Sequence, residues 1–123
     1  MKVKELEKEF IGIGEVSGMK FAQITSQQHG FIYEVSLEGI TPHYEVFERK
    51  LSPICIDFEK KIFSETESKV MYPNSKHFGI WAWTCNTLEE AKVKLEKIIE
   101  DVERREKERK EIAKNLEDEN TKE

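Results

Sequence analysis

The chain has 123 residues, of which 37% are hydrophobic and 37% charged, and its formal net charge is −5 at pH 7. This length predicts one domain, and the negative charge disfavours nonspecific attraction to nucleic acid or to acidic membranes. No apolar run approaches the roughly 18 residues of a membrane span, and the charged start lacks the apolar core of a signal peptide. The two cysteines form neither a C-x-x-C pair nor a disulfide framework, so we expect a cytoplasmic protein with reduced thiols and no membrane partner.

The first ten residues place three apolar side chains at helical spacing. Val3, Leu6 and Phe10 lie three and four positions apart among lysines and glutamates. Such spacing is typical of one face of a helix. We therefore expect a short N-terminal helix that ends near Gly12.

From residue 19 onward the apolar period changes to two, which is typical of strands. The clearest strand is FIYEVSLEG at 31–39, whose aromatic and branched residues share one face while glutamates and a serine share the other. Candidate strands at 19–26 and 43–50 flank it behind short turns. Three consecutive strands joined in this way predict an antiparallel meander.

Further strand character follows, although its boundaries stay open between residues 52 and 72. ICIDFE at 54–59 alternates apolar and polar residues, and KVMYP at 69–73 is a short strand that Pro73 ends. Between them, SETES at 64–68 is expected as an exposed loop. FGIWAWT at 78–84 is rich in aromatic and branched residues, which brings the predicted antiparallel sheet to four or five strands.

The strongest local signal marks the start of a helix. Thr87-x-x-Glu90 has the spacing of a capping box, in which each side chain bonds the backbone of the other residue. An apolar stripe at helical spacing follows as far as Val102. The sequence therefore predicts an α+β fold in which a long C-terminal helix, from about residue 88, packs on the sheet and extends beyond it.

The extension from 103 to 116 is almost wholly charged but contains no helix breaker. The spacing predicts one domain at 1–102, a charged helical extension at 103–116 and a disordered tail at 117–123. The extension is either a solvated helix or a pairing surface with arginines at core heptad positions. Candidate interface residues on the second reading are Val102, Arg105, Arg109, Ile112 and Leu116.

The sequence offers little support for catalysis. Its cysteines and histidines show no short ligand spacing, and no phosphate loop or nucleophile motif is present. Its many carboxylates are best interpreted as partners in surface ion pairs. We therefore expect no catalytic residue, no metal site and no cofactor.

Trp81 and Trp83 are the only tryptophans, and strand alternation places them on one face. If a second layer covers that face they belong to the core, and if none does they form a binding patch. The loop that precedes them would supply polar neighbours at the rim. Candidate binding residues on this face and rim are Phe47, Arg49, Tyr72, Lys76, His77, Trp81 and Trp83.

By exclusion, the sequence favours a small non-enzymatic domain that binds a protein partner or a second copy of itself, with the C-terminal helix as one route to a homodimer. The alternative is a single-stranded nucleic-acid-binding module that stacks bases on the aromatic residues of the sheet. The near-neutral sheet region and the acidic overall balance disfavour this alternative. A small enzyme of unrecognised type ranks third.

Overall fold

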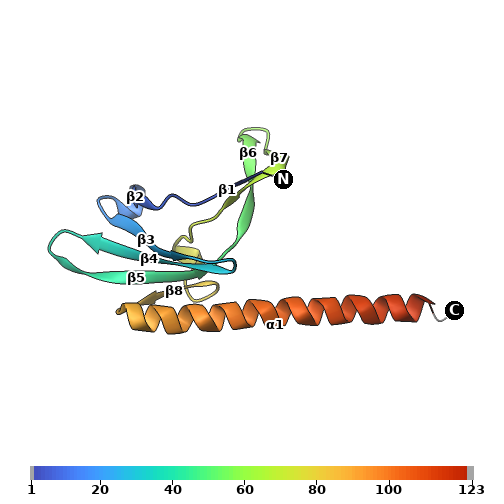
Figure 1. Cartoon of the computed structure of the whole chain (residues 1–123). Coiled ribbons are helices and arrows are strands. Elements are labelled where there is room, and N and C mark those ends of the chain that lie inside the picture. The colour runs from blue at the N-terminus through green and yellow to red at the C-terminus, as the bar shows by residue number, and fades with distance from the viewer. Residues whose placement is uncertain (1, 122–123) are drawn as a thin grey trace.

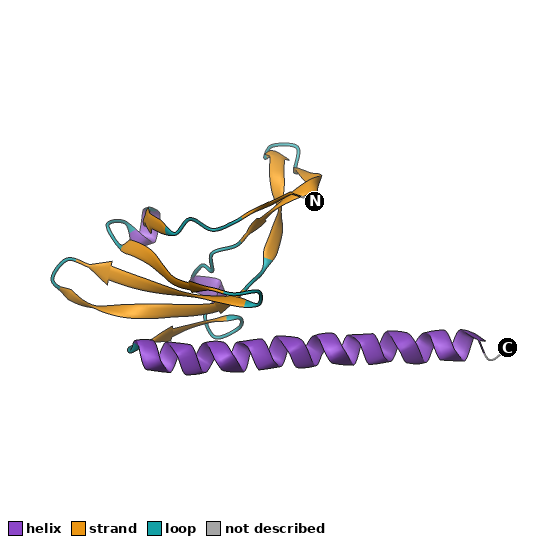
Figure 2. Cartoon of the chain, in the orientation of Figure 1, coloured by secondary structure: helices purple, strands orange, loops and turns teal. Residues whose placement is uncertain are grey.

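The computed structural model of the chain describes residues 2–121, and within this range the side chains of all but Glu15 and residues 117–121. Figure 1 shows two small sheets and one long helix, and Figure 2 marks the same elements by type. In chain order the elements are β1 (Lys2–Lys4), β2 (Glu9–Ile11), the 3-10 turn η1 (Gly14–Val16), β3 (Lys20–Ser26), β4 (Gly30–Leu37), β5 (Ile40–Glu48), β6 (Leu51–Asp57), β7 (Ile62–Val70), the 3-10 turn η2 (Ser75–His77), β8 (Ala82–Cys85) and α1 (Leu88–Thr121).

The larger sheet is antiparallel and has the strand order β2-β3-β4-β5-β8. The smaller sheet has the order β1-β7-β6, with β1 parallel and β6 antiparallel to β7. It rises steeply from the end of the larger sheet, while α1 lies along the opposite side of the larger sheet (Figure 1). The α+β class, the five-stranded antiparallel sheet and the long C-terminal helix are as the sequence predicts, whereas the mixed three-stranded sheet is an addition to that prediction.

One face of the five-stranded sheet packs against α1. Ile32 and Val46 meet the helical stripe of Ala91, Leu95 and Ile98, and all of these side chains are buried. The helix begins at the expected place, because the Thr87 hydroxyl accepts a hydrogen bond of 3.1 Å from the backbone nitrogen of Glu90. Position 30 requires glycine, because a Cβ there would lie 2.8 Å from the Phe47 carbonyl oxygen on the neighbouring strand and 2.7 Å from Leu95 Cδ1 of the helix.

The other face of the sheet carries an aromatic core. Phe21, Phe31, Tyr33 and Phe47 are buried there beneath the N-terminal segment and the segment between β7 and β8. The Tyr33 hydroxyl donates a 2.7 Å hydrogen bond to the Glu7 carbonyl and accepts one of 2.9 Å from the Gln23 side chain. Burial raises the pKa of Tyr33. Both faces of the larger sheet are therefore covered.

The predicted N-terminal helix is wrong. Residues Lys2–Lys4 form β1 beside β7, and residues Glu9–Ile11 form β2 at the edge of the larger sheet. Phe10 stacks on Phe21 with ring centroids 4.7 Å apart, so its apolar side chain packs against the neighbouring strand β3 instead of lying on a helical face. A helix of two or three turns is marginal by itself, and here two free sheet edges offer the backbone stable partners instead.

The region from 51 to 70 is a long hairpin. SETES at 64–68 is part of β7, so the loop expected there is wrong, and the polar residues tolerate a strand because this sheet is exposed on its faces. The hairpin turns between β6 and β7 at residues 58–61, where Lys61 adopts a positive φ of 54°. β8 begins at Ala82, so the strand predicted from residue 78 is shorter than expected.

α1 has 34 residues and a length of about 50 Å at 1.5 Å per residue. Its helical backbone continues to Thr121, beyond the end at residue 116 that the sequence suggests. Residues 122–123 and the side chains from 117 onward lie outside the described residues, so disorder of the tail 117–123 stays a prediction. No helix in the described part of the chain combines the length and apolar character that a membrane span requires.

Candidate functional site

The structure brings four of the predicted binding residues into one aromatic cluster. The ring centroid of Phe47 lies 4.8 Å from that of Tyr72 and 6.3 Å from that of Trp81, and the His77 ring lies 4.6 Å from Trp81. Phe47 has no exposed surface, so it supports the cluster and makes no direct contact with a partner. Tyr72, His77 and Trp81 are half-buried. Tyr72 and Trp81 each pack on Phe47, and His77 packs on Trp81, so these rings do not form an open stacking surface.

The two tryptophans do not share a face, so the alternation inferred from the sequence is wrong here. Trp81 belongs to the aromatic core, whereas Trp83 packs with the residues beneath α1 and has the Lys94 ammonium 4.0 Å from its ring centroid. The cause is a turn at residues 79–81, where Gly79 has a φ of 90°, so Trp81 lies before the strand and outside its alternation. Each tryptophan is half-buried in a different layer of the core.

Arg49 and Lys76 stand apart from the cluster. The Arg49 guanidinium lies 4.6 Å from the Phe31 ring centroid, and its Nη1 pairs with Glu5 Oε1 at 2.7 Å. This arginine therefore joins the N-terminal segment to the point where β5 leads into β6. Lys76 is exposed on η2.

A pocket of about 480 Å³ opens beside the aromatic core, and Glu45 is the acidic residue among those that line it. Glu45 Oε1 accepts a 2.8 Å hydrogen bond from the Tyr72 hydroxyl, and Glu45 Oε2 lies 3.3 Å from His43 Nε2. Burial is the main cause that raises the pKa of Tyr72, and the negative charge of Glu45 adds to it. From the sequence alone, Glu45 is expected to be one of many surface carboxylates. The signal that could have identified it is its alternation with Phe47, which places this carboxylate on a face with buried aromatic residues.

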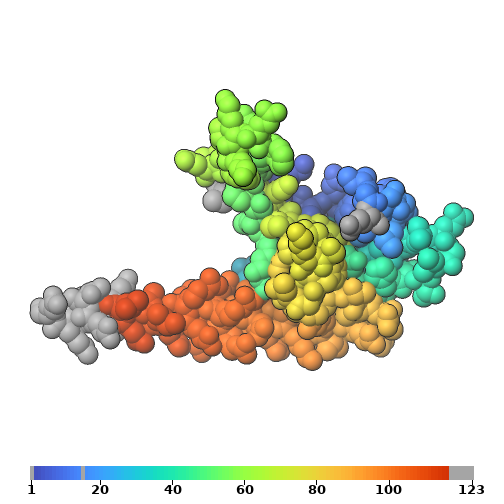
Figure 3. Space-filling model, turned by 180° about the vertical axis from the view of Figure 1, so that it is seen from behind, coloured from blue at the N-terminus to red at the C-terminus, as the bar shows by residue number. Residues whose placement is uncertain are grey.

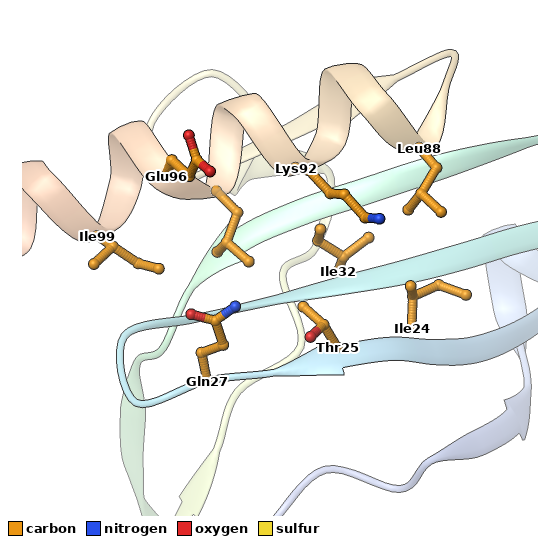
Figure 4. A pocket seen from close by; sticks show the side chains of 9 residues that line it. Ile24, Thr25, Gln27, Ile32, Leu88, Lys92, Glu96 and Ile99 are labelled. Carbon is orange, nitrogen blue, oxygen red and sulfur yellow. The ribbon is translucent and has the colours of Figure 1, made fainter.

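A second recess, of about 500 Å³, lies between α1 and the strands β3 and β4 (Figure 4). α1 packs mainly on β4, β5 and β8, so β3 lies largely outside the area of the sheet that the helix covers. Leu88 and Ile99 project from the helix toward the strands, and Ile24 and Ile32 point back toward the helix (Figure 4). Thr25, Gln27, Lys92 and Glu96 also line this recess, which was missed because the sequence does not specify how the helix axis crosses the sheet.

The predicted helix interface divides into a packed part and an exposed part. Val102 is buried against the sheet, and the Arg105 guanidinium pairs with Glu48 at the end of β5. Burial raises the pKa of Glu48, but hydrogen bonds from Lys50 and Arg105 more than offset this effect, so the net pKa lies below its ordinary value. Further along the same face, Ile112 is 59% exposed and Leu116 is 56% exposed.

The exposed part of α1 extends away from both sheets, below the three-stranded sheet (Figure 3). A groove of about 450 Å³ marks where it leaves the domain, lined by Glu48 and Lys50 on one side and by Val102, Arg109 and Ile112 on the other. Thus Arg105, Arg109 and Ile112 lie on the side of the helix that faces this groove, and Leu116 follows Ile112 at i+4 spacing. The predicted interface residues form one continuous face, although the sheet already occupies its first part.

Among the side chains that the structure describes, no three metal-binding groups come together in a cluster that could hold an ion. Comparisons of the chain with protein-family models, with curated proteins and with solved structures gave no match.

Proposed function

We propose that this chain is a small non-enzymatic interaction domain that forms a homodimer through the exposed half of α1. The observation that carries this proposal is the position of Ile112 and Leu116, each more than half exposed on a continuation of the buried face. Leu95 and Val102 of that face are covered by the sheet, whereas the last two apolar residues have no covering layer within the described chain. Branched apolar residues repeated at heptad spacing favour pairing with another helix.

The position of the sheet restricts the orientation of such a pair. Residues up to Val102 use the same helical face to pack on the sheet, so two helices in parallel would bring both sheets into the same space. An antiparallel overlap places the two sheets at opposite ends of the pair. The part of α1 from residue 103 to residue 121 supplies roughly 28 Å of helix for this overlap.

The charge pattern also favours the antiparallel arrangement. Residues 104–110 carry five arginines and lysines against two glutamates, whereas residues 117–119 are all acidic. An antiparallel overlap centred near Ile112 places the basic segment of each copy beside the acidic segment of the other. Opposite charges that flank an apolar seam select partner and orientation in helix pairs.

The test is sedimentation equilibrium of the full chain and of two variants. The wild type is expected to sediment at twice the 14.5 kDa mass of one chain. The double variant Ile112→Asp, Leu116→Asp is expected to raise the dissociation constant by about a hundredfold or more, because it places charges in an apolar seam. The matched control is Val93→Asp, which is 54% exposed on the same helix but lies off this face and should leave dimerisation unchanged. A monomeric wild type, or equal effects of both variants, would refute the proposal.

A distance measurement tests the orientation separately. Spin labels at a cysteine introduced by Glu103→Cys, in a chain with both native cysteines changed to serine, should lie roughly 28 Å apart along an antiparallel pair. A parallel pair would bring them within about 10 Å, the usual spacing of packed helices. The short distance would contradict the antiparallel arrangement even if the dimer itself forms.

A further inference from the structure

The pocket around Glu45 lies on the face of the larger sheet opposite α1, so helix pairing does not involve it. One wall is aromatic and apolar. Phe10 and Phe21 stack with centroids 4.7 Å apart, and the edge of Tyr72 meets both rings at 5.4 and 5.3 Å. Phe78 and the highly exposed Ile13 extend this wall toward solvent.

The lining of the pocket also includes polar residues. Glu45 contributes a carboxylate that is only 14% exposed, and Thr84, Asn74 and Ser75 line the pocket as well. None of the described residues that line the pocket has a cationic side chain. Each Glu45 oxygen has one neighbour, the Tyr72 hydroxyl or His43 Nε2, and a carboxylate oxygen can accept more than one hydrogen bond. The carboxylate therefore retains acceptor capacity toward the pocket.

We propose that this pocket binds a small organic ammonium ion that has an aromatic or alkyl body. The ammonium group donates to the Glu45 carboxylate, and the apolar body rests against Phe10 and Phe78. A protonated amine matches the negative charge of Glu45, which is the one formal charge among the described lining residues, and its positive charge is also attracted to aromatic faces. The pocket volume of about 480 Å³ lies within the range of small-molecule sites.

The experiment is a titration of the full chain with phenethylammonium chloride, followed by amide and methyl chemical shifts. Saturable shifts are expected at residues around Glu45, Tyr72 and Phe78. The neutral analogue 2-phenylethanol, which has the same aromatic body, should bind about tenfold or more weakly because it lacks the charged donor. Equal binding of the two compounds, or no saturable shift in this region, would overturn the proposal.

Two variants connect the binding to the carboxylate. Glu45→Gln retains an acceptor for the Tyr72 hydroxyl and should weaken phenethylammonium about tenfold. Glu34→Gln is the matched control, because Glu34 also accepts from a tyrosine hydroxyl, that of Tyr44 at 3.4 Å, but lies outside the pocket. It should leave the affinity unchanged, and an unaffected Glu45→Gln variant would refute the assignment.

A second titration distinguishes a free amine from a lysine side chain as the source of the ammonium group. Acetylation of the lysine in a short peptide removes the positive charge and replaces the ammonium group with a neutral amide. Binding of phenethylammonium with no binding of either peptide assigns the pocket to free amines. Selective binding of the unmodified peptide assigns it to a protein side chain and supports the same ammonium chemistry.

Discussion

The two sheets of this protein have similar sequence patterns but differ in how completely other segments cover their faces. Both are built from strands in which apolar residues recur. In the five-stranded sheet, α1 covers one face and the N-terminal segment with residues 71–81 covers the other, so Val46 and Phe47 have no exposed surface. In the three-stranded sheet Ile56 is 68% exposed and Phe63 is 52% exposed.

This difference shows that strand character and burial are separate properties. Alternation determines which side chains share a face, but a second layer is needed to remove that face from water. The larger sheet has two such layers, whereas the smaller one is connected to the core mainly at its base, where Val70 is buried. We therefore expect most of the folding free energy to come from the larger sheet.

The largest expected effect is a difference between two phenylalanine truncations. Phe47→Ala should reduce the free energy of unfolding by about 3–5 kcal/mol, because it leaves a cavity in the centre of the aromatic core. Phe63→Ala removes a half-exposed ring and should cost less than about 1 kcal/mol. Urea unfolding followed by tryptophan fluorescence measures both, since Trp81 contacts Phe47. Equal losses would mean that the smaller sheet contributes to stability as much as the core.

An effect of intermediate size is a loss of folding stability at alkaline pH, because burial raises the pKa values of Tyr33 and Tyr72 in the folded chain. Unfolded tyrosine ionises near pH 10, so above that pH the unfolded state loses protons that the folded state retains. The contribution of these two tyrosines to stability should be constant below about pH 10 and fall above it, by up to roughly 1.4 kcal/mol per pH unit for each tyrosine.

Tyr72→Phe removes one of these groups, which makes the assignment testable. The variant should lose stability less steeply above pH 10 than the wild type does, as measured by urea midpoints at several pH values. An unchanged slope would mean that the Tyr72 hydroxyl is accessible to solvent in the folded protein. In that case the cover over this face of the larger sheet is looser than its geometry indicates.

The parts of the fold that the sequence predicts well are those with several consistent signals. β4 has strict alternation between two turns, and its Phe31 and Tyr33 do face the core. α1 combines a cap at Thr87 with an apolar stripe, and both are present as expected. Local propensity and tertiary packing agree in these elements.

The parts predicted poorly depend on partners distant in sequence. Val3 and Phe10 match a helical spacing, yet β7 and β3 provide strand partners that single-sequence patterns do not reveal. The tryptophan pair illustrates another limit. One turn at Gly79 was enough to move Trp81 out of the alternation that would have placed it beside Trp83.

The candidate sites also differ in whether local sequence or distant partners determine them. Ile112 and Leu116 could be identified by period alone, because they continue a helical stripe. Alternation with Phe47 places Glu45 on the aromatic face, but its position beside Tyr72 depends on how residues 71–78 fold back over the sheet, which the period does not reveal. Side chains from distant segments form this pocket, so no local motif records it.

The smallest expected effect on stability is at the tip of the hairpin, where Phe58 is 88% exposed. Phe58→Ser should change the free energy of unfolding by less than about 0.5 kcal/mol, because the ring has almost no packing to lose. It should nevertheless lower the binding of an apolar fluorescent dye, since Phe58 is part of the apolar surface that this sheet exposes. A loss of stability near that of Phe47→Ala would show that the tip is packed in solution, and the contrast between the two sheets would then be wrong.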